Sequence, residues 1–123
     1  MSLAVAATDP SLVLSKATVR ASRELGLRQA DLARILGLST ATASRLDSGA
    51  WQLSLGSKAW ELATAFVRVY RSLAAITGGK SEAMRAWLHS ENDALGAVPA
   101  QRLLSAEGLF SVLNYLDASR GRL

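Results

Sequence analysis

Hydrophobic residues recur along this chain at three- and four-residue steps, which is the spacing of α-helices that bury one face. Asp, Ser or Pro precedes most of these runs, and Gly follows most of them, as at helix starts and ends. The pattern predicts an all-α protein with helices at about 10–25, 29–36, 40–48, 57–77, 81–90, 99–104 and from 105 onwards. The connector 50–56 is predicted to be a loop anchored in the core, with a strand as the alternative.

The stretch 29–49 predicts two short helices joined by a tight turn. Gly37 stands where a helix ends in a left-handed residue, and Ser39 can cap the second helix. The inward positions of that helix are Ala43 and Leu46, and its remaining surface is small, polar and basic. This is the pattern of a helix-turn-helix. An ordinary helical hairpin in a bundle is the alternative, because it needs the same turn glycine and inward leucines.

The sequence QADLARILGLSTATASRLDSG resembles the helix-turn-helix of the Xre/Cro/phage-repressor family. In such a unit the N-terminal part of the second helix enters the major groove, and the resemblance places Gln29 at a position that contacts the DNA backbone or a neighbouring base. The candidate DNA-binding residues are Gln29, Ser39, Thr40, Ala41, Thr42, Ser44 and Arg45. Of these, Arg45 suits a guanine or a phosphate, and Ala41 offers only a methyl contact. Because few of these side chains are long and polar, we expect weak half-sites, paired about 34 Å apart.

The helix predicted over 57–77 is apolar around a wide arc. Its two apolar stripes are Leu62, Phe66, Val69, Leu73 and Ile76, and Trp60, Ala63, Val67, Tyr70 and Ala74. A helix with so wide an apolar arc must be covered on more than one side. It is therefore the central helix of a bundle or part of a dimer interface, and the pattern favours self-association as a homodimer.

The last third of the chain carries a second pattern, made of apolar residues, one proline and two glycines. Gly108, near the start of the last helix, lowers helix stability by up to about 1 kcal/mol, which indicates the close approach of another backbone. The order and spacing of the set resemble the C-terminal toxin-binding domain of the Xre/MbcA/ParS antitoxins: Trp87-Leu88, Asn92, Leu95-Gly96, Pro99, Leu103-Leu104, Gly108 and Val112. The alternative is a helical bundle in which these residues are only core, and we expect Trp87 to pack in the core in either case.

Antitoxins of this family carry an Xre-like helix-turn-helix upstream, so the two resemblances cover nearly the whole chain. They imply an antitoxin that binds a toxin of the RES fold, which consumes NAD or transfers its ADP-ribose part. The antitoxin obstructs the toxin's substrate pocket and represses its own operon. The implied toxin-binding residues are Trp87, Asn92, Leu95, Gly96, Pro99, Leu103, Leu104, Gly108, Arg120, Arg122 and Leu123, the last three as a basic tail that obstructs the pocket. Arg85 and Arg102 are further candidates at the rim.

We divide the chain accordingly into a DNA-binding domain at 1–56, a linking and dimerisation helix at 57–80 and a toxin-binding domain at 81–123. A stand-alone Xre/Cro-type transcriptional repressor, whose C-terminal half only dimerises, is the alternative function.

Composition supports a nucleic-acid partner and argues against catalysis. The chain has 123 residues, a net charge of +4, no cysteine and a single histidine, His89. Five arginines stand against Glu24 and Asp31 between residues 20 and 45, which favours an acidic partner. The absence of cysteine excludes disulfides and thiolate chemistry, and His89 has no clustered metal-ligating partner. We therefore expect neither an enzyme nor a cofactor or metal site.

No membrane or export signal is recognisable in the sequence. The N-terminal MSLAVAATDP lacks the basic flank and the long apolar run of a signal peptide. The most apolar long stretch, 60–76, contains Glu61, Arg68 and Arg71, which a membrane span does not tolerate. We expect a cytoplasmic protein with no membrane partner.

Overall fold

The computed structural model describes residues 9–121, and within that range it contains seven α-helices and no strand. The helices are α2 (Pro10–Glu24), α3 (Gln29–Leu36), α4 (Thr40–Ser48), α5 (Lys58–Thr77), α6 (Ser81–His89), α7 (Pro99–Arg102) and α8 (Ala106–Arg120). An isolated pairing of Asn92 with Ala97 closes the turn between α6 and α7. The all-α prediction is confirmed, and each predicted helix is found within a few residues of its expected bounds.

The caps explain why the helices begin where they do. The side chains of Asp9, Ser39, Ser57 and Ser105 each accept hydrogen bonds from amides in the first turn of α2, α4, α5 and α8. Each of these bonds satisfies a backbone donor that the helix itself leaves without a partner.

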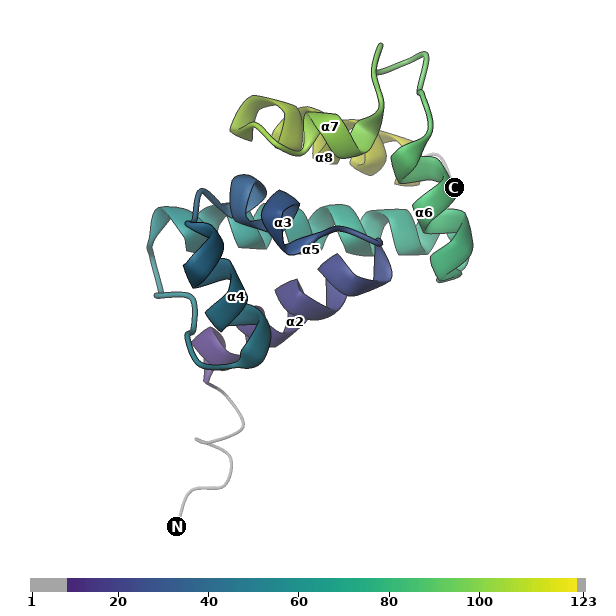
Figure 1. Cartoon of the computed structure of the whole chain (residues 1–123). Helices are drawn as coiled ribbons and strands as arrows, with labels where there is room; N and C mark the ends of the chain where they lie inside the picture. The colour runs from purple at the N-terminus through teal and green to yellow at the C-terminus, as the bar shows by residue number, and fades with distance from the viewer. Residues whose placement is uncertain (1–8, 122–123) are drawn as a thin grey trace.

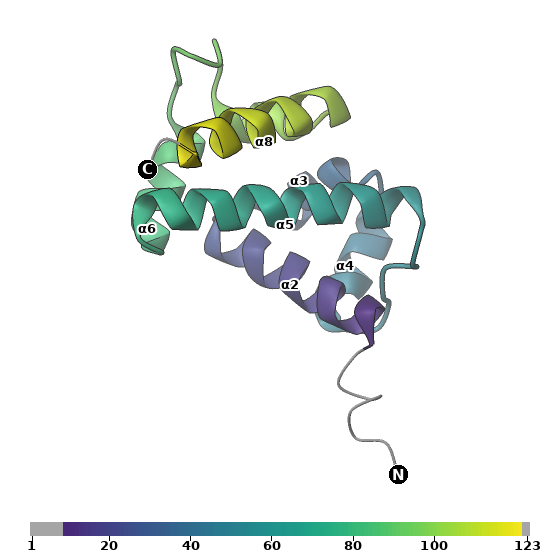
Figure 2. The ribbon, with the colours of Figure 1, turned by 180° about the vertical axis from the view of Figure 1, so that it is seen from behind.

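Helix α5 runs through the middle of the molecule and packs against α2, α3, α6 and α8 (Figures 1 and 2). Its core residues are almost fully enclosed, with Ala63, Phe66, Val69 and Leu73 at 0% exposure. Most of the wide apolar arc of this helix is therefore covered by helices of the same chain, as the central-helix interpretation predicts. Ile76, near the carboxyl end of α5, is the exception among the predicted stripe residues, with 36% of its surface exposed. The homodimer stays a prediction. Its support is the expected pairing of two weak DNA half-sites, and no longer the apolar arc of α5.

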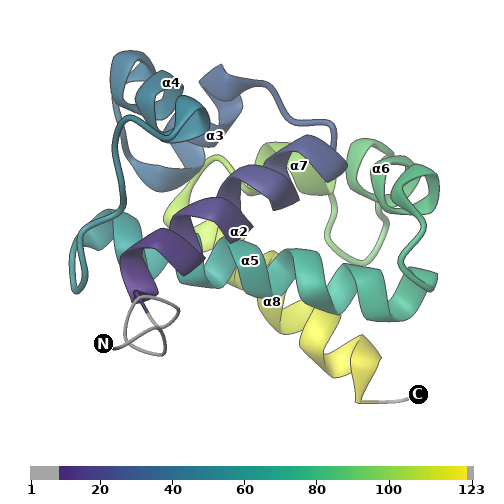
Figure 3. The ribbon, with the colours of Figure 1, turned by 90° about the horizontal axis from the view of Figure 1, so that it is seen from below.

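Seen from below, α2 lies diagonally between α5 and the pair formed by α3 and α4 (Figure 3). The connector after α4 is a loop, as predicted, and it is anchored by the fully buried Leu53. The amide of Leu53 donates to the Ser15 hydroxyl of α2 at 3.0 Å, and Trp51 packs half-buried against the core. These contacts fix the carboxyl end of α4 against α2.

No helix within residues 9–121 combines the length and the apolarity needed to cross a membrane.

Candidate functional site

Helices α3 and α4 form the predicted helix-turn-helix. Leu32, Ile35 and Leu36 of α3 and Ala43 and Leu46 of α4 are buried in the core. Their burial turns the opposite face of α4 to solvent. Six of the seven predicted DNA-binding residues are exposed, and Thr42 is half-buried. Six of these residues lie at or within the first two turns of α4, and Gln29 lies at the start of α3.

Hydrogen bonds between neighbouring side chains order this face. The Ser39 hydroxyl accepts from the Thr42 amide at 3.1 Å and lies 3.0 Å from the Thr42 hydroxyl. The guanidinium of Arg45 donates to the same hydroxyl at 3.3 Å. Arg45 is thereby directed back along α4 toward its N-terminus, which is the end expected to meet the DNA.

Internal ion pairs neutralise most of the arginines near the helix-turn-helix. Salt bridges join Arg20 to Glu24 at 3.6 Å, Arg23 to Asp47 at 3.1 Å and Arg28 to Asp31 at 3.2 Å. The hydrogen bond and the charge of Asp31 raise the pKa of Arg28. Within the part of the chain that the structure describes, Arg34 and Arg45 have no carboxylate partner. Of the five arginines near the helix-turn-helix, these two are therefore the most available to an external anion.

In the C-terminal half, most of the predicted toxin-binding pattern builds the fold itself. Pro99, Leu103 and Gly108 are buried, and Leu95 and Leu104 pack half-buried against the core. Gly108 lies against the backbone of Arg102, so the close approach predicted from its place in a helix is found. These buried and half-buried residues therefore hold the C-terminal helices in place and contribute little to the exposed surface.

The turn between α6 and α7 is organised by Asn92. Its side-chain oxygen accepts from the Leu95 amide at 3.1 Å, and its backbone pairs with Ala97 in both directions at 3.0 and 3.3 Å. Gly96 completes the turn at the surface. Asn92 is thus a turn-forming residue in this structure.

Two aromatic residues outside the predicted set stand out in this half. Tyr115 of α8 stacks on Trp87 of α6 with ring centroids 6.3 Å apart and an interplanar angle of 19°. Trp87 is half-buried and packs against the core, as predicted. Phe110 of α8 is 43% exposed, which is unusual for so large an apolar side chain. The sequence carried a signal for this exposure, because Phe110 lies beside the helical stripe of Leu109, Val112, Leu113 and Leu116 and not within it.

The two arginines predicted at the toxin rim, Arg85 and Arg102, and Arg120 of the predicted obstructing tail have internal partners or are partly enclosed. Arg85 donates to backbone carbonyls at the end of α2, and the Nε atom of Arg102 is enclosed without a partner among the described residues. Arg120 donates to the Ser72 hydroxyl at 3.3 Å, so it lies against α5. Arg122 and Leu123, also predicted for toxin binding, lie outside the described residues.

Comparison with known protein families decides what these two halves are. Residues 4–68 match the antitoxin Xre-like helix-turn-helix domain. The chain belongs to the Xre-like antitoxin family. Residues 72–122 of this antitoxin match the antitoxin Xre/MbcA/ParS C-terminal toxin-binding domain. A search of curated proteins finds no match.

The two family matches settle which interpretation of each half holds. The predicted helix-turn-helix is confirmed over the ordinary helical hairpin. The match of the C-terminal half to a toxin-binding domain favours an antitoxin over a repressor whose C-terminal half only dimerises. The matches meet between residues 68 and 72, inside the central helix α5.

Proposed function

We propose that this antitoxin neutralises a cognate toxin of the RES fold through its C-terminal half and represses its own operon through α4. One observation carries the proposal: a helix-turn-helix domain and a toxin-binding domain are joined in one chain, over residues 4–68 and 72–122. The RES fold and the NAD-consuming reaction of the toxin come from the family that the C-terminal pattern resembles. In this proposal the antitoxin acts in the cytoplasm and has no reaction of its own.

For operator binding, we infer that the exposed face of α4 enters the major groove with its N-terminal turn foremost. Arg45 carries the longest polar side chain on this face and is held toward that turn by Thr42. Arg34 of α3 is the second arginine here without a carboxylate partner among the described residues, and it suits a phosphate contact. Because the remaining predicted contacts are short side chains, one unit binds weakly, and a homodimer on two half-sites supplies the affinity.

For toxin binding, we infer that Phe110 and the stacked pair of Trp87 and Tyr115 supply the apolar contacts. Aromatic side chains are enriched among the residues that dominate the energy of protein interfaces. The exposure of Phe110 and the half-exposure of Trp87 support this assignment. Asn92, Gly96, Pro99 and the other residues of the pattern hold the turn and the helices that carry these side chains.

The C-terminal segment from Arg120 through Arg122 and Leu123 is proposed to obstruct the toxin's substrate pocket. A guanidinium suits acidic catalytic residues that line such a pocket, because it forms paired hydrogen bonds with carboxylates. Arg120 already lies at the carboxyl end of α8, next to Asp117 and Ser72.

Co-expression with the product of the neighbouring open reading frame tests the antitoxin role. We expect the neighbour to arrest growth when expressed alone, and the antitoxin to restore growth and to co-purify with it. A titration of the antitoxin against the promoter duplex of its own operon tests repression separately. Specific binding to the duplex by a chain that neither rescues growth nor co-purifies with its neighbour would support the stand-alone repressor instead.

A further inference from the structure

Side chains of α6 hold the carboxyl end of α2. Arg85 donates from Nε to the Glu24 carbonyl at 2.8 Å and from Nη2 to the Arg23 carbonyl at 3.0 Å. His89 Nε2 lies 3.0 Å from the Leu25 carbonyl, and it is the donor because a carbonyl only accepts. Residues 85 and 89 are one turn apart on α6, so one face of α6 serves three consecutive carbonyls: the last two of α2 and that of Leu25, which follows it.

The chemistry of this contact fits a helix end. The last carbonyls of a helix have no donor within it, and they carry the negative end of the helix dipole. The planar guanidinium of Arg85 serves two of them at once. Gly26 leaves space for the arginine: it adopts a φ of +69°, and a Cβ there would lie 3.3 Å from Cδ and from Nε of Arg85.

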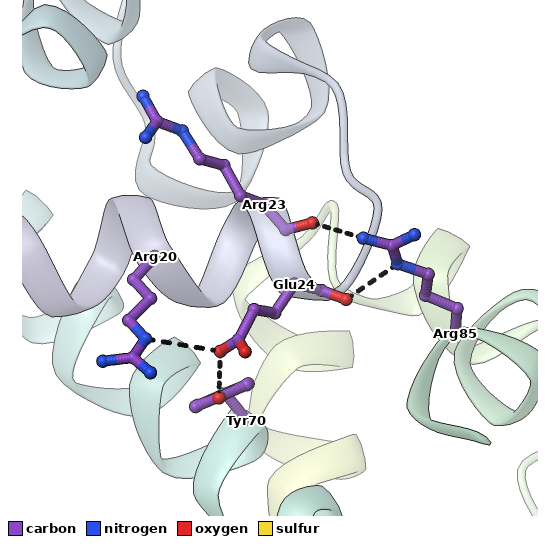
Figure 4. Close-up of polar contacts among 5 residues, drawn as sticks. All are labelled: Arg20, Arg23, Glu24, Tyr70 and Arg85. Atoms are coloured by element: carbon purple, nitrogen blue, oxygen red, sulfur yellow. Dashed lines mark hydrogen bonds and ion pairs between the residues drawn. The ribbon is translucent and has the colours of Figure 1, made fainter. Parts of the chain in front are cut away.

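The same end of α2 is bonded to the recognition helix α4. The guanidinium of Arg23 donates to the Asp47 carboxylate at 3.1 Å and to the Asp47 carbonyl at 3.5 Å. Figure 4 shows that the Arg23 side chain extends away from Arg85, while the Arg23 carbonyl faces the Arg85 guanidinium. Arg23 therefore links α6 to α4, because its carbonyl accepts from Arg85 and its guanidinium donates to Asp47.

We propose that Arg85, a residue of the toxin-binding half, is a positioning residue for DNA binding. It fixes the end of α2 and, through the bond between Arg23 and Asp47, the orientation of α4. This inference rests on the DNA binding proposed above. Trp87, a proposed toxin contact, lies on the same nine-residue helix as Arg85. The proposed toxin surface and the proposed operator surface are therefore joined by the contacts of Arg85 and Arg23.

The test measures binding of the full-length chain to the promoter duplex of its own operon by fluorescence anisotropy, at several salt concentrations. We expect Arg85→Ala to weaken binding by about three- to tenfold, which is less than the full loss of two hydrogen bonds of ordinary strength, because the change disturbs the orientation of α4 and removes no contact with DNA. The slope of affinity against salt stays unchanged, because no phosphate contact is removed. Arg85→Lys keeps the charge but loses the paired donors, so it weakens binding as Arg85→Ala does.

Two controls separate positioning from charge and from folding. Lys80→Ala removes another exposed cation of the same half, one whose side chain does not cap α6, and leaves affinity within about twofold of the unaltered chain. All titrations are run where circular dichroism shows every variant to be fully folded. Arg85→Ala combined with Asp47→Asn is less than additive, because both changes break the same chain of contacts.

Hydrogen exchange provides a readout that needs no DNA. We expect Arg85→Ala to raise amide exchange over residues 24–28 and 45–50 and to leave that of α8 unchanged. Unchanged exchange in those two segments overturns the inference, whether or not the chain binds its promoter. Arg85→Lys with full affinity, together with a salt slope lowered by about one in Arg85→Ala, identifies a direct phosphate contact and also overturns it. An unaltered chain that fails to bind the duplex counts against the proposed repression alone.

Discussion

The hydroxyl of Tyr70 donates a hydrogen bond to the carboxylate of Glu24, which joins the central helix α5 to the end of α2 (Figure 4). This bond is the largest cause of the raised pKa of Tyr70, followed by burial. An ionised Tyr70 has no proton to donate and faces a like charge, so ionisation favours the unfolded chain.

The sign of the resulting pH dependence follows from this shift. Because the pKa is higher in the folded chain, the contribution of Tyr70 to stability is complete below its unfolded value of about 10. It is lost as the pH rises from there through the raised folded pKa. At neutral pH we expect Tyr70→Phe to lower the free energy of unfolding by about 1 kcal/mol. Above about pH 10, the difference in free energy of unfolding between the unaltered chain and Tyr70→Phe becomes smaller.

Urea denaturation at a series of alkaline pH values checks this prediction. Tyr115→Phe is the matched control, because the Tyr115 ring stacks on Trp87 and its hydroxyl has no hydrogen-bond partner among the described residues. A gap between the unaltered chain and Tyr70→Phe that stays constant across this range contradicts the assigned role of Tyr70.

A second prediction concerns Gly108, where a Cβ would lie 1.9 Å from the Arg102 carbonyl oxygen. In an open helix, replacing glycine by alanine gains about 1 kcal/mol. Here the methyl group collides with backbone, so we expect Gly108→Ala to destabilise the protein by about 3 kcal/mol or more. Thermal unfolding measures the change. Ala118→Gly, at an exposed position of the same helix, is expected to cost only about 1 kcal/mol, and a stabilised Gly108→Ala would refute the packing argument.

The sequence was sufficient to predict the helices, their caps and the close contact at Gly108, because each depends on local spacing or on a single special residue. It was not sufficient to predict how arginines pair across helices. Arg85 was assigned to the toxin rim, yet its partners are carbonyls more than sixty positions earlier in the chain. Arg23 likewise finds Asp47 only once α2 and α4 are packed. Long side chains at the surface have many candidate partners, and tertiary packing selects among them.

The sequence also could not predict which elements cover the apolar surface of α5. A two-sided apolar helix requires neighbours, but periodicity does not say whether they come from this chain or from a second copy. The structure places α2, α3 and α8 around it. Membership of the two families, matched over residues 4–68 and 72–122, could be predicted from the sequence, because the motifs that indicate each family lie within short stretches of the chain.

The third prediction tests the toxin surface at Phe110. Phe110→Ser removes an exposed aromatic anchor, and we expect it to weaken toxin binding by about 2 kcal/mol or more, with little change in stability. Leu55→Ser is the matched control, because Leu55 is 68% exposed but lies in the DNA-binding half. Isothermal titration with the purified toxin measures both variants. Equal affinities for the two would remove Phe110 from the interface.

The fourth prediction concerns Arg45. Arg45→Ala is expected to weaken operator binding by about 1–3 kcal/mol without unfolding the protein, because this side chain is exposed and, among residues 9–121, bonds only to Thr42. Lys80→Ala serves as the control for net charge, since α6 lies at the far end of the molecule from α4 (Figure 1). A gel-shift titration in which Arg45→Ala binds as tightly as Lys80→Ala would show that Arg45 makes no contact with the operator.

The fifth prediction separates folding from DNA binding at the cap of α4. Ser39→Asp keeps an oxygen that caps the Thr42 amide, and it adds a negative charge that favours the helix N-terminus. Stability is therefore expected to stay the same or to rise by a few tenths of a kcal/mol. The same charge repels DNA phosphates if this turn enters the groove, and we expect operator affinity to fall at least about tenfold. Ser39→Ala, by contrast, lowers stability by about 1 kcal/mol and changes affinity much less. Full operator affinity for Ser39→Asp would mean that the N-terminal turn of α4 faces away from the DNA.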